Sequence, residues 1–267
     1  MLTDFQPWID CWGLEPDGAP FETEFGSRLL PVRRGGEAAM LKIALHEEER
    51  RGGAVMAWRG GVGAARVFAF DAEAVVMERL DGPRSLAAMA RGGGDEAACR
   101  ALCEAAALFH APTAGPPPSG IIPLEWWFAA LWPQAERAGG IYAEAALVAR
   151  ELLGSQGPPV VLHGDVHHDN ILDGGARGWL AIDPKGLWGD RGYDYANLMC
   201  NPDASTAVAH LDARLEIAME ISGFSRERLL KWVLAYLGLS ASWTLTSRGD
   251  PWQALRIAEA VRVRLGV

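Results

Sequence analysis

The sequence predicts an α+β fold in two lobes, a small strand-rich N-terminal lobe of residues 1–80 and a larger, mostly helical C-terminal lobe of residues 81–267. Short runs of β-branched and aromatic residues, separated by turn residues, fill the first part of the chain. Ala-rich helical patterns follow Gly82. With 267 residues, of which 49% are apolar, the chain is long enough for two lobes that share a cleft.

The first strand pair is predicted at residues 25–32 and 38–43, joined by a turn with two glycines. Lys42 has apolar neighbours on both sides, which is an unusual place for a charge near a strand end. A helix is expected over residues 47–58, although a Gly-Gly pair weakens it, and from this helix Glu49 can reach back to Lys42. A solvent-facing lysine on an edge strand and a solvated charged face of the helix would show the same residues.

A second hairpin is predicted over residues 67–70 and 74–80, leading into Asp81 and Gly82. The composition then changes to helix-forming, so we place the lobe boundary near residue 81. A helix is expected from Asp95, after three glycines, because acidic residues are favourable at a helix N-terminus. Further helices are predicted over residues 124–137 with an interruption at Pro133, 141–153, and about 205–222, 225–247 and 250–265, with a Pro-rich loop at 114–119.

The stretch of residues 163–183, HGDVHHDNILDGGARGWLAID, carries most of the candidate chemistry. A short β-branched strand at 160–162 precedes it, and residues 171–173 and 179–182 predict a hairpin around a Gly-Gly turn. The hairpin returns Asp183 to the neighbourhood of Asp165 and Asn170. Such oxygen ligands suit Mg²⁺, and Asp165 can also accept a proton from a hydroxyl. The spacing H-x-D-x-x-x-x-N, followed by a strand and an Asp, is the layout of a kinase catalytic loop with its metal-binding Asp.

The segments HGDVHHDNIL and WLAIDPKGLWGDRGYDYANLMCNP resemble the aminoglycoside phosphotransferase family, and within it the streptomycin 6-phosphotransferase group, also called aminoglycoside/hydroxyurea resistance kinases. The resemblance is dense over residues 160–202, with weaker cues over nearly the whole chain. It implies a protein-kinase-like two-lobe fold, with ATP as phosphoryl donor and a small cationic aminoglycoside as acceptor. It also implies that Asp165 is the catalytic base, that Asn170 and Asp183 bind Mg²⁺, and that Lys42, paired with Glu49, positions the phosphates.

The resemblance implies further roles around this centre. No G-x-G-x-x-G loop precedes Lys42, so Gly26 and Ser27 are the expected phosphate-loop residues, with backbone amides that face the phosphates. The backbone from Glu78 to Leu80 would bind adenine, as one more strand edge, although an ordinary hairpin strand has the same composition. His163 is expected to be buried and to support the loop. Asp194 is expected to cap the next helix and to brace the catalytic loop.

Other functions fit parts of the same pattern. A metal-dependent hydrolase is one, because His163, Asp165, His167 and His168 lie within six residues, and imidazoles suit Zn²⁺. However, only one or two of these side chains could face one metal from a short loop. A pseudokinase or nucleotide-binding scaffold is disfavoured because Lys42, Asp165, Asn170 and Asp183 are all present. A kinase for another acceptor, such as a sugar, a choline-like or amino-alcohol metabolite, or hydroxyurea, keeps the chemistry and changes the substrate.

The composition favours some classes of binding partner over others and indicates a cellular compartment. A net charge of −9 argues against nucleic-acid binding through the phosphate backbone and fits a cationic substrate, for which Glu216, Glu220 and Asp250 are candidate contacts. The four cysteines form no CxxC pair, so we expect reduced thiols in a cytoplasm. The first ten residues lack the pattern of a signal peptide, and the longest uncharged run, 232–247, is too short and too interrupted for a membrane span. A monomer is the favoured state.

Overall fold

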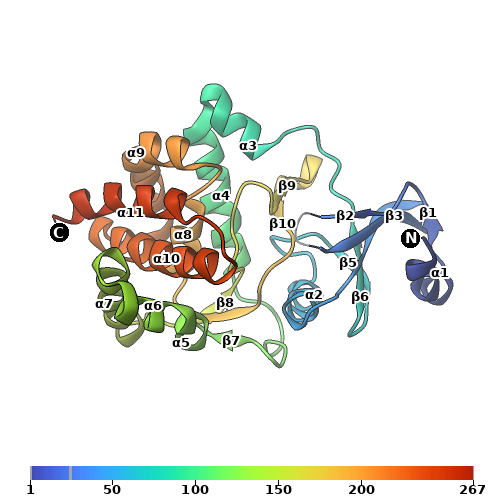
Figure 1. Ribbon diagram of the computed structural model, residues 1–267. Coiled ribbons are helices and arrows are strands. Elements are labelled where there is room, and N and C mark those ends of the chain that lie inside the picture. Colours follow the sequence, from blue (N-terminus) through green and yellow to red (C-terminus); the bar gives the residue numbers. More distant parts are fainter. Residues whose placement is uncertain (1, 24–25, 267) are drawn as a thin grey trace.

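The computed structural model describes residues 2–23 and 26–266 and confirms an α+β fold in two lobes (Figure 1). The smaller lobe contains, within the described residues, a six-stranded antiparallel sheet in the order β1-β3-β4-β6-β5, with β2 paired to β3. Strand β6 ends four residues before Gly82, and the first helix of the larger lobe begins four residues after it. The division at residues 80 and 81 stays a prediction. The strands are β1 (Glu15–Pro16), β2 (Phe21–Glu22), β3 (Arg28–Arg34), β4 (Glu37–Ile43), β5 (Val67–Phe70) and β6 (Ala74–Glu78).

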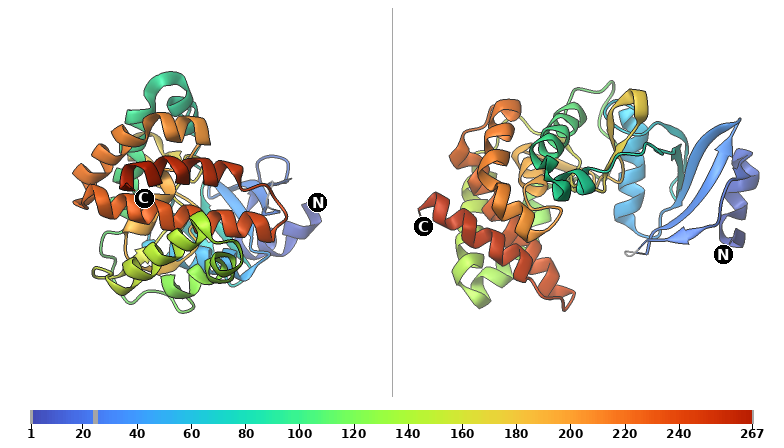
Figure 2. Two further views of the ribbon diagram at one scale, coloured as in Figure 1. Left: turned by 60° about the vertical axis from the view of Figure 1, so that its left-hand side comes forward. Right: turned by 90° about the horizontal axis from the view of Figure 1, so that it is seen from above.

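Two helices lie on opposite faces of this sheet, α1 (Gln6–Trp12) on the outer face and α2 (Glu47–Arg59) toward the larger lobe (Figure 2). Alternate side chains of β4 explain the two faces, because successive residues of a strand point to opposite sides. Leu41 packs in a buried cluster with Phe5 of the short helix before α1, whereas the next residue, Lys42, points to the cleft face. Of the strand predicted at 25–32, Phe25 lies outside the described residues, Gly26 and Ser27 precede the observed strand, and β3 covers residues 28–32.

The larger lobe is built around α10 (Arg226–Thr246), which packs against α7, α8 and α11. Helix α10 contains residues 232–246 of the uncharged run, and Trp232 in it is fully buried. No described helix is both long and apolar enough to cross a membrane. The other helices are α3 (Leu86–Met89), α4 (Asp95–Phe109), α5 (Leu124–Trp127), α6 (Leu131–Ala138), α7 (Gly140–Gly154), α8 (Gly192–Leu198), α9 (Ala204–Ser222) and α11 (Trp252–Leu265).

The helix predicted over residues 124–137 is interrupted, but not at Pro133. A 3₁₀ turn, Phe128–Ala130, separates α5 from α6, and Pro133 lies in the first turn of α6. A proline is tolerated in the first turn because its missing N–H would have no partner within the helix. Residues Ala90–Gly94 join α3 to α4 through a kink, at which Gly93 adopts a non-helical conformation with φ of 90°.

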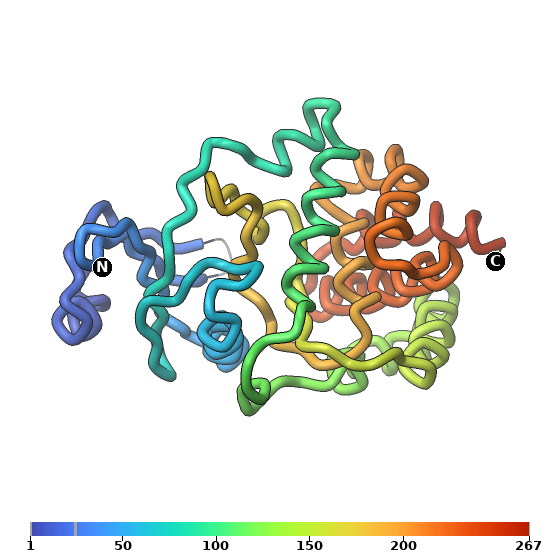
Figure 3. Tube along the Cα trace, turned by 180° about the vertical axis from the view of Figure 1, so that it is seen from behind, coloured from blue at the N-terminus to red at the C-terminus, as the bar shows by residue number. Residues whose placement is uncertain are grey.

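The segment of residues 160–183, called the catalytic stretch below for its predicted role, lies between the lobes, as Figure 3 shows for its hairpin. Strands β8 (Val160–Leu162), β9 (Ile171–Asp173) and β10 (Trp179–Ala181) confirm the predicted strand and hairpin. The sequence did not predict β11 (Leu187–Gly189), which pairs with β8 and, in parallel, with β7 (Ile122–Pro123). Backbone hydrogen bonds from Ala65 to Ala181 and from Ala181 to Gly63 tie the hairpin to the smaller lobe.

Candidate active site

A cavity of about 690 Å³ opens between the lobes. Strands β4 and β6 and the N-terminal part of α2 form one side of it, and the catalytic stretch forms the other. Eight of the residues proposed from the sequence for the base, metal and nucleotide roles line this cavity. Those that line it are Ser27, Lys42, Glu49, Glu78, Leu80, Asp165, Asn170 and Asp183.

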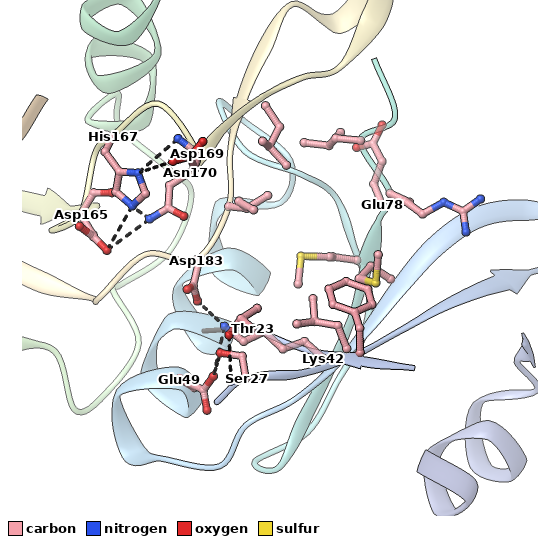
Figure 4. Close-up of a pocket in the computed structure, with 18 of the residues that line it drawn as sticks. Thr23, Ser27, Lys42, Glu49, Glu78, Asp165, His167, Asp169, Asn170 and Asp183 are labelled. Atoms are coloured by element: carbon pink, nitrogen blue, oxygen red, sulfur yellow. Dashed lines mark hydrogen bonds and ion pairs between the residues drawn. The ribbon is translucent and has the colours of Figure 1, made fainter. Parts of the chain in front are cut away.

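Lys42 is the centre of one cluster in the cavity (Figure 4). Its Nζ lies 2.5 Å from Asp183 Oδ1 and 3.3 Å from Glu49 Oε1. The Ser27 hydroxyl donates to Glu49 Oε1 at 2.5 Å. Burial opposes ionisation of Glu49, but the Ser27 hydroxyl and the Lys42 ammonium together lower the pKa of Glu49 below its usual value. The pairing of an ionised Glu49 with Lys42 fixes the ammonium in the cavity.

Asp183 has an unusual backbone conformation, with φ of 57°. Residues other than glycine rarely adopt this left-handed region, and such conformations cluster at functional sites. Burial alone would raise the pKa of Asp183, but Lys42 and Lys185 lower it below its usual value. The Asp183 carboxylate is therefore ionised and aimed at Lys42.

The loop after β8 places Asp165 and Asn170 side by side. The Asn170 Nδ2 group donates to the Asp165 carbonyl at 3.0 Å and to Asp165 Oδ2 at 3.3 Å. The Ile182 N–H donates to the Asn170 carbonyl at 2.9 Å, which links the loop to the end of the hairpin just before Asp183. No described residue donates a hydrogen bond to Asn170 Oδ1, so this oxygen is free for a ligand.

His163 and Asp194 lie behind the loop, and both are fully buried. The Asp194 carboxylate accepts the N–H of His163 at 2.9 Å, the N–H of Gly164 at 2.8 Å, and a contact from His110 Nε2 at 2.7 Å. It makes no cap hydrogen bond to α8, so the prediction of a capping role is wrong. The reason is that the chain leaves β8 with two buried N–H groups that need an acceptor, and Asp194 supplies both.

The histidines of the stretch do not converge on one point. Both ring nitrogens of His163 are engaged, Nε2 with the Ile182 carbonyl at 2.8 Å and Nδ1 with the Asp165 N–H at 3.1 Å. His168 is buried away from the cavity, and only His167 of the three lines it. Among the described residues, no group of three or more His, Cys, Asp or Glu side chains is placed to hold a metal. The hydrolase alternative therefore lacks its zinc site.

The phosphate-loop expectation needs correction. The N–H of Gly26 donates to the Thr23 carbonyl at 2.9 Å, and the N–H of Ser27 donates to Thr23 Oγ1 at 3.0 Å. Both amides donate to Thr23, so they do not face the cavity as expected.

The other end of the cavity is apolar. Met40, Met77, Leu172 and Ile182 line it from both lobes, next to Leu80. No described residue accepts a hydrogen bond from the Leu80 N–H. The Glu78 side chain, in contrast, is held by Arg66 and Arg177.

Sequence reasoning missed Lys185. Its Nζ lies 3.1 Å from Glu48 Oε1, 3.5 Å from Asp165 Oδ2 and 4.0 Å from Asp183 Oδ2. The available signal was a cation two residues after Asp183, where protein kinases have glycine.

The acidic residues proposed for a cationic substrate lie elsewhere. Glu216 pairs with Arg226, Glu220 pairs with Arg100, and neither these two nor Asp250 lines the cavity. The described carboxylates that line it near Asp165 are instead Glu48 and Asp169.

Comparison with known proteins places this site in a family. Residues 11–248 match the sequence model of the aminoglycoside/hydroxyurea antibiotic resistance kinases. A streptomycin 3''-kinase from Klebsiella pneumoniae is 48% identical over 242 residues, covering 88% of this chain and 90% of the relative. A streptomycin 6-kinase from Streptomyces glaucescens is 30% identical, covering 95% of this chain and 87% of the relative.

A solved structure supports the fold assignment. The aminoglycoside phosphotransferase APH(4)-Ia, a thermostable mutant in ternary complex with ADP and hygromycin B, superimposes with a TM-score of 0.66. The two chains are 12% identical, and the comparison covers 98% of this chain and 99% of that one. The expected protein-kinase-like fold is confirmed. The chain belongs to the aminoglycoside/hydroxyurea antibiotic resistance kinase family.

Proposed function

We propose that the protein transfers the γ-phosphoryl group of ATP, with Mg²⁺, to a hydroxyl group of streptomycin. The observation that carries the proposal is the convergence of Lys42, Asp165, Asn170 and Asp183 in one cavity between the lobes. The 48% identity to a streptomycin 3''-kinase supports streptomycin as the acceptor. We further propose that it acts as a monomer, and ATP as donor fits a cytoplasmic enzyme.

Asp183 and Asn170 fit a magnesium site. The ionised carboxylate of Asp183 and the free Oδ1 of Asn170 are hard oxygen donors, and Mg²⁺ in kinases is held by such a pair together with substrate phosphates. When bound, the ion neutralises charge on the β- and γ-phosphates. The carboxylate of Asp183 already lies against Lys42, so the same two residues would hold the phosphates and the ion together.

The remaining site residues orient the two substrates. The apolar end of the cavity receives adenine, and the Leu80 N–H donates to its ring edge. Lys42, fixed by Glu49, binds the phosphates. Asp165 accepts the proton of the acceptor hydroxyl, whose oxygen forms the new bond to the γ-phosphorus, while the bond to the β-phosphate oxygen breaks and its electron pair leaves with ADP.

The acceptor enters beside Asp165. Streptomycin carries guanidinium groups, and Glu48 and Asp169 give the cavity two carboxylates near Asp165. Of the two hydroxyl positions named among the relatives, we propose the 3'' position, because the identity to the 3''-kinase is 48% and that to the Streptomyces glaucescens 6-kinase is 30%.

A panel of acceptors tests this function. Purified protein is incubated with Mg-ATP and, separately, with streptomycin, hydroxyurea, choline or a neutral sugar, and ADP release is followed. We expect streptomycin to stimulate ADP release and to gain the mass of one phosphoryl group. Release with another acceptor but not with streptomycin would keep the kinase and discard this substrate. Release with none of them would contradict the proposed function.

A further inference from the structure

We propose that Lys185 binds the γ-phosphoryl group of ATP and stabilises it during transfer. This inference rests on the proposed function and adds a catalytic residue to it. The Lys185 ammonium lies within 4.0 Å of both Asp165 and Asp183, the carboxylates proposed as base and metal ligand. A phosphoryl group that moves from a nucleotide held by Asp183 to a hydroxyl held by Asp165 must pass this ammonium.

The other described lysine and arginine side chains that line the cavity do not contact Asp165. Among the described lining residues, the lysines and arginines are Lys42, Arg79 and Lys185. Lys42 lies between Glu49 and Asp183, and Arg79 is held at the adenine end by Asp17 and Asp81. Lys185 is thus the described lysine or arginine of the cavity that contacts Asp165. It is the one that can follow the phosphoryl group to the acceptor.

Hydrogen bonds hold the backbone of Lys185 at both its N–H and its carbonyl group. Its N–H donates to the His163 carbonyl at 2.6 Å, and its carbonyl accepts from Arg51 Nε at 2.7 Å. Helix α2 approaches the preceding residue so closely that a Cβ on Gly52 would lie 2.3 Å from the Pro184 carbonyl oxygen. Glu48, on the same helix, holds the ammonium. The cation is therefore positioned before any nucleotide arrives, which is the arrangement that makes electrostatic stabilisation effective.

Charge balance gives the physical reason for a lysine at this point. The γ-phosphate is itself anionic, and it must approach the carboxylate of Asp165 to react. Without a cation between them, the two anions would repel each other in a cleft partly shielded from water. Lys185 offsets this repulsion. It remains protonated throughout and donates hydrogen bonds to the phosphoryl oxygens, while the proton of the acceptor goes to Asp165.

The test compares Lys185→Met and Lys185→Gln with Lys185→Arg, which keeps the charge. Calorimetry measures the affinity for ADP and for AMP-PNP, which differ in the γ-phosphoryl group. Both neutral variants should weaken AMP-PNP binding about 10- to 100-fold more than ADP binding. Lys185→Arg should keep most of the preference for AMP-PNP. The matched control is Lys231→Met, a lysine of α10 that pairs with Glu151 and Glu227 away from the cavity and should leave both affinities unchanged.

The kinetic arm separates this role from a structural one. The neutral variants should lower kcat about 10²–10³-fold, with the thermal unfolding midpoint near that of the wild type. Equal loss of affinity for ADP and AMP-PNP, or a kcat within tenfold of wild type, would overturn the assignment. The affinity arm uses no acceptor, so it decides the role of Lys185 even if streptomycin fails as a substrate. A wild-type protein that binds neither nucleotide would instead refute the proposed function, and Lys185 with it.

Discussion

At the scale of single residues, the two aspartates of the site differ in their surroundings. Asp183 lies against Lys42 at 2.5 Å, in a strained backbone conformation. Asp165 contacts an amide group of Asn170 and the ammonium of Lys185, and it faces the open cavity. One carboxylate is thus suited to hold the metal and its nucleotide, and the other to meet an acceptor hydroxyl.

This difference predicts that substitutions of the two aspartates have different effects on turnover and on nucleotide binding. Asp165→Ala should lower kcat by about 10²–10⁴-fold, the usual effect of removing a positioned base, and should leave Mg-ATP affinity nearly intact. Asp183→Asn should weaken Mg-ATP binding more, because it removes charge next to the ion. Calorimetry and steady-state kinetics on both variants check this. If Asp165→Ala kept more than about a tenth of wild-type turnover, Asp165 would not be the catalytic base.

Two buried histidines predict how stability depends on pH. Burial lowers the pKa of His163, and it lowers the pKa of His168 to about 3. Both are neutral in the folded protein, whereas in the unfolded chain they bind protons below about pH 6.5. The free energy of unfolding should therefore fall, as the pH drops below that value, by up to about 1.4 kcal/mol per pH unit for each histidine.

Urea unfolding between about pH 7.5 and about pH 5 measures this loss. His168→Leu should flatten the slope, since neither ring nitrogen of His168 has a hydrogen-bond partner among the described residues. Stability that stays constant or rises on acidification would contradict the assignment of neutral buried histidines.

At the scale of elements, helix α2 packs directly against the segment after Asp183. This contact explains why a glycine, unfavourable within a helix, occurs at position 52. At Gly52, a Cβ would meet the Pro184 carbonyl oxygen at 2.3 Å. At Gly53, it would meet the ring of Phe70 at 2.9 Å, and that side chain is 39% exposed and free to turn.

The two glycines therefore make a matched pair of variants. Gly52→Ala should destabilise the protein by about 1–3 kcal/mol and lower kcat/KM, because it pushes α2 away from Pro184 and moves Glu49 relative to Lys42. Gly53→Ala should be nearly neutral or stabilising, by up to about 1 kcal/mol from helix propensity. Thermal unfolding and kinetics of the two variants check this. Equal effects of both substitutions would show that α2 is not held at Pro184.

Features whose sequence signal lies within their own segment could be predicted. Features that depend on contacts between distant segments could not. The hairpin of β9 and β10 has a local Gly-Gly turn signal, and both this hairpin and helix α2 lie within a residue or two of their predicted ranges. Strand β11 has three residues, and its partners lie far away in the chain, so no local pattern indicates it. Asp194 looks like a capping residue in its own segment, yet its carboxylate serves the backbone thirty residues earlier. The contacts of Lys185 depend on the packing of α2, which the sequence does not display.

At the scale of the whole molecule, the net charge of −9 is the relevant property. A negative field attracts a cationic acceptor over a distance that salt shortens, since the Debye length falls from about 30 Å at 0.01 M to about 3 Å at 1 M ionic strength. We expect the KM for streptomycin to rise with ionic strength while kcat changes little. Titrations with sodium chloride and potassium chloride should agree. A KM that is independent of salt would mean that neither the net charge nor Glu48 and Asp169 guide the substrate.

We propose above that the protein uses this cavity to phosphorylate streptomycin at the 3'' position. The most direct measurement is the phosphorus–proton correlation spectrum of the product formed from streptomycin and Mg-ATP, with Asp165→Ala protein as the control. We expect one new phosphate ester, coupled to the 3'' proton and absent from the control. An ester at the 6 position would contradict the site of transfer, and an ester formed equally by the control would contradict the role of Asp165.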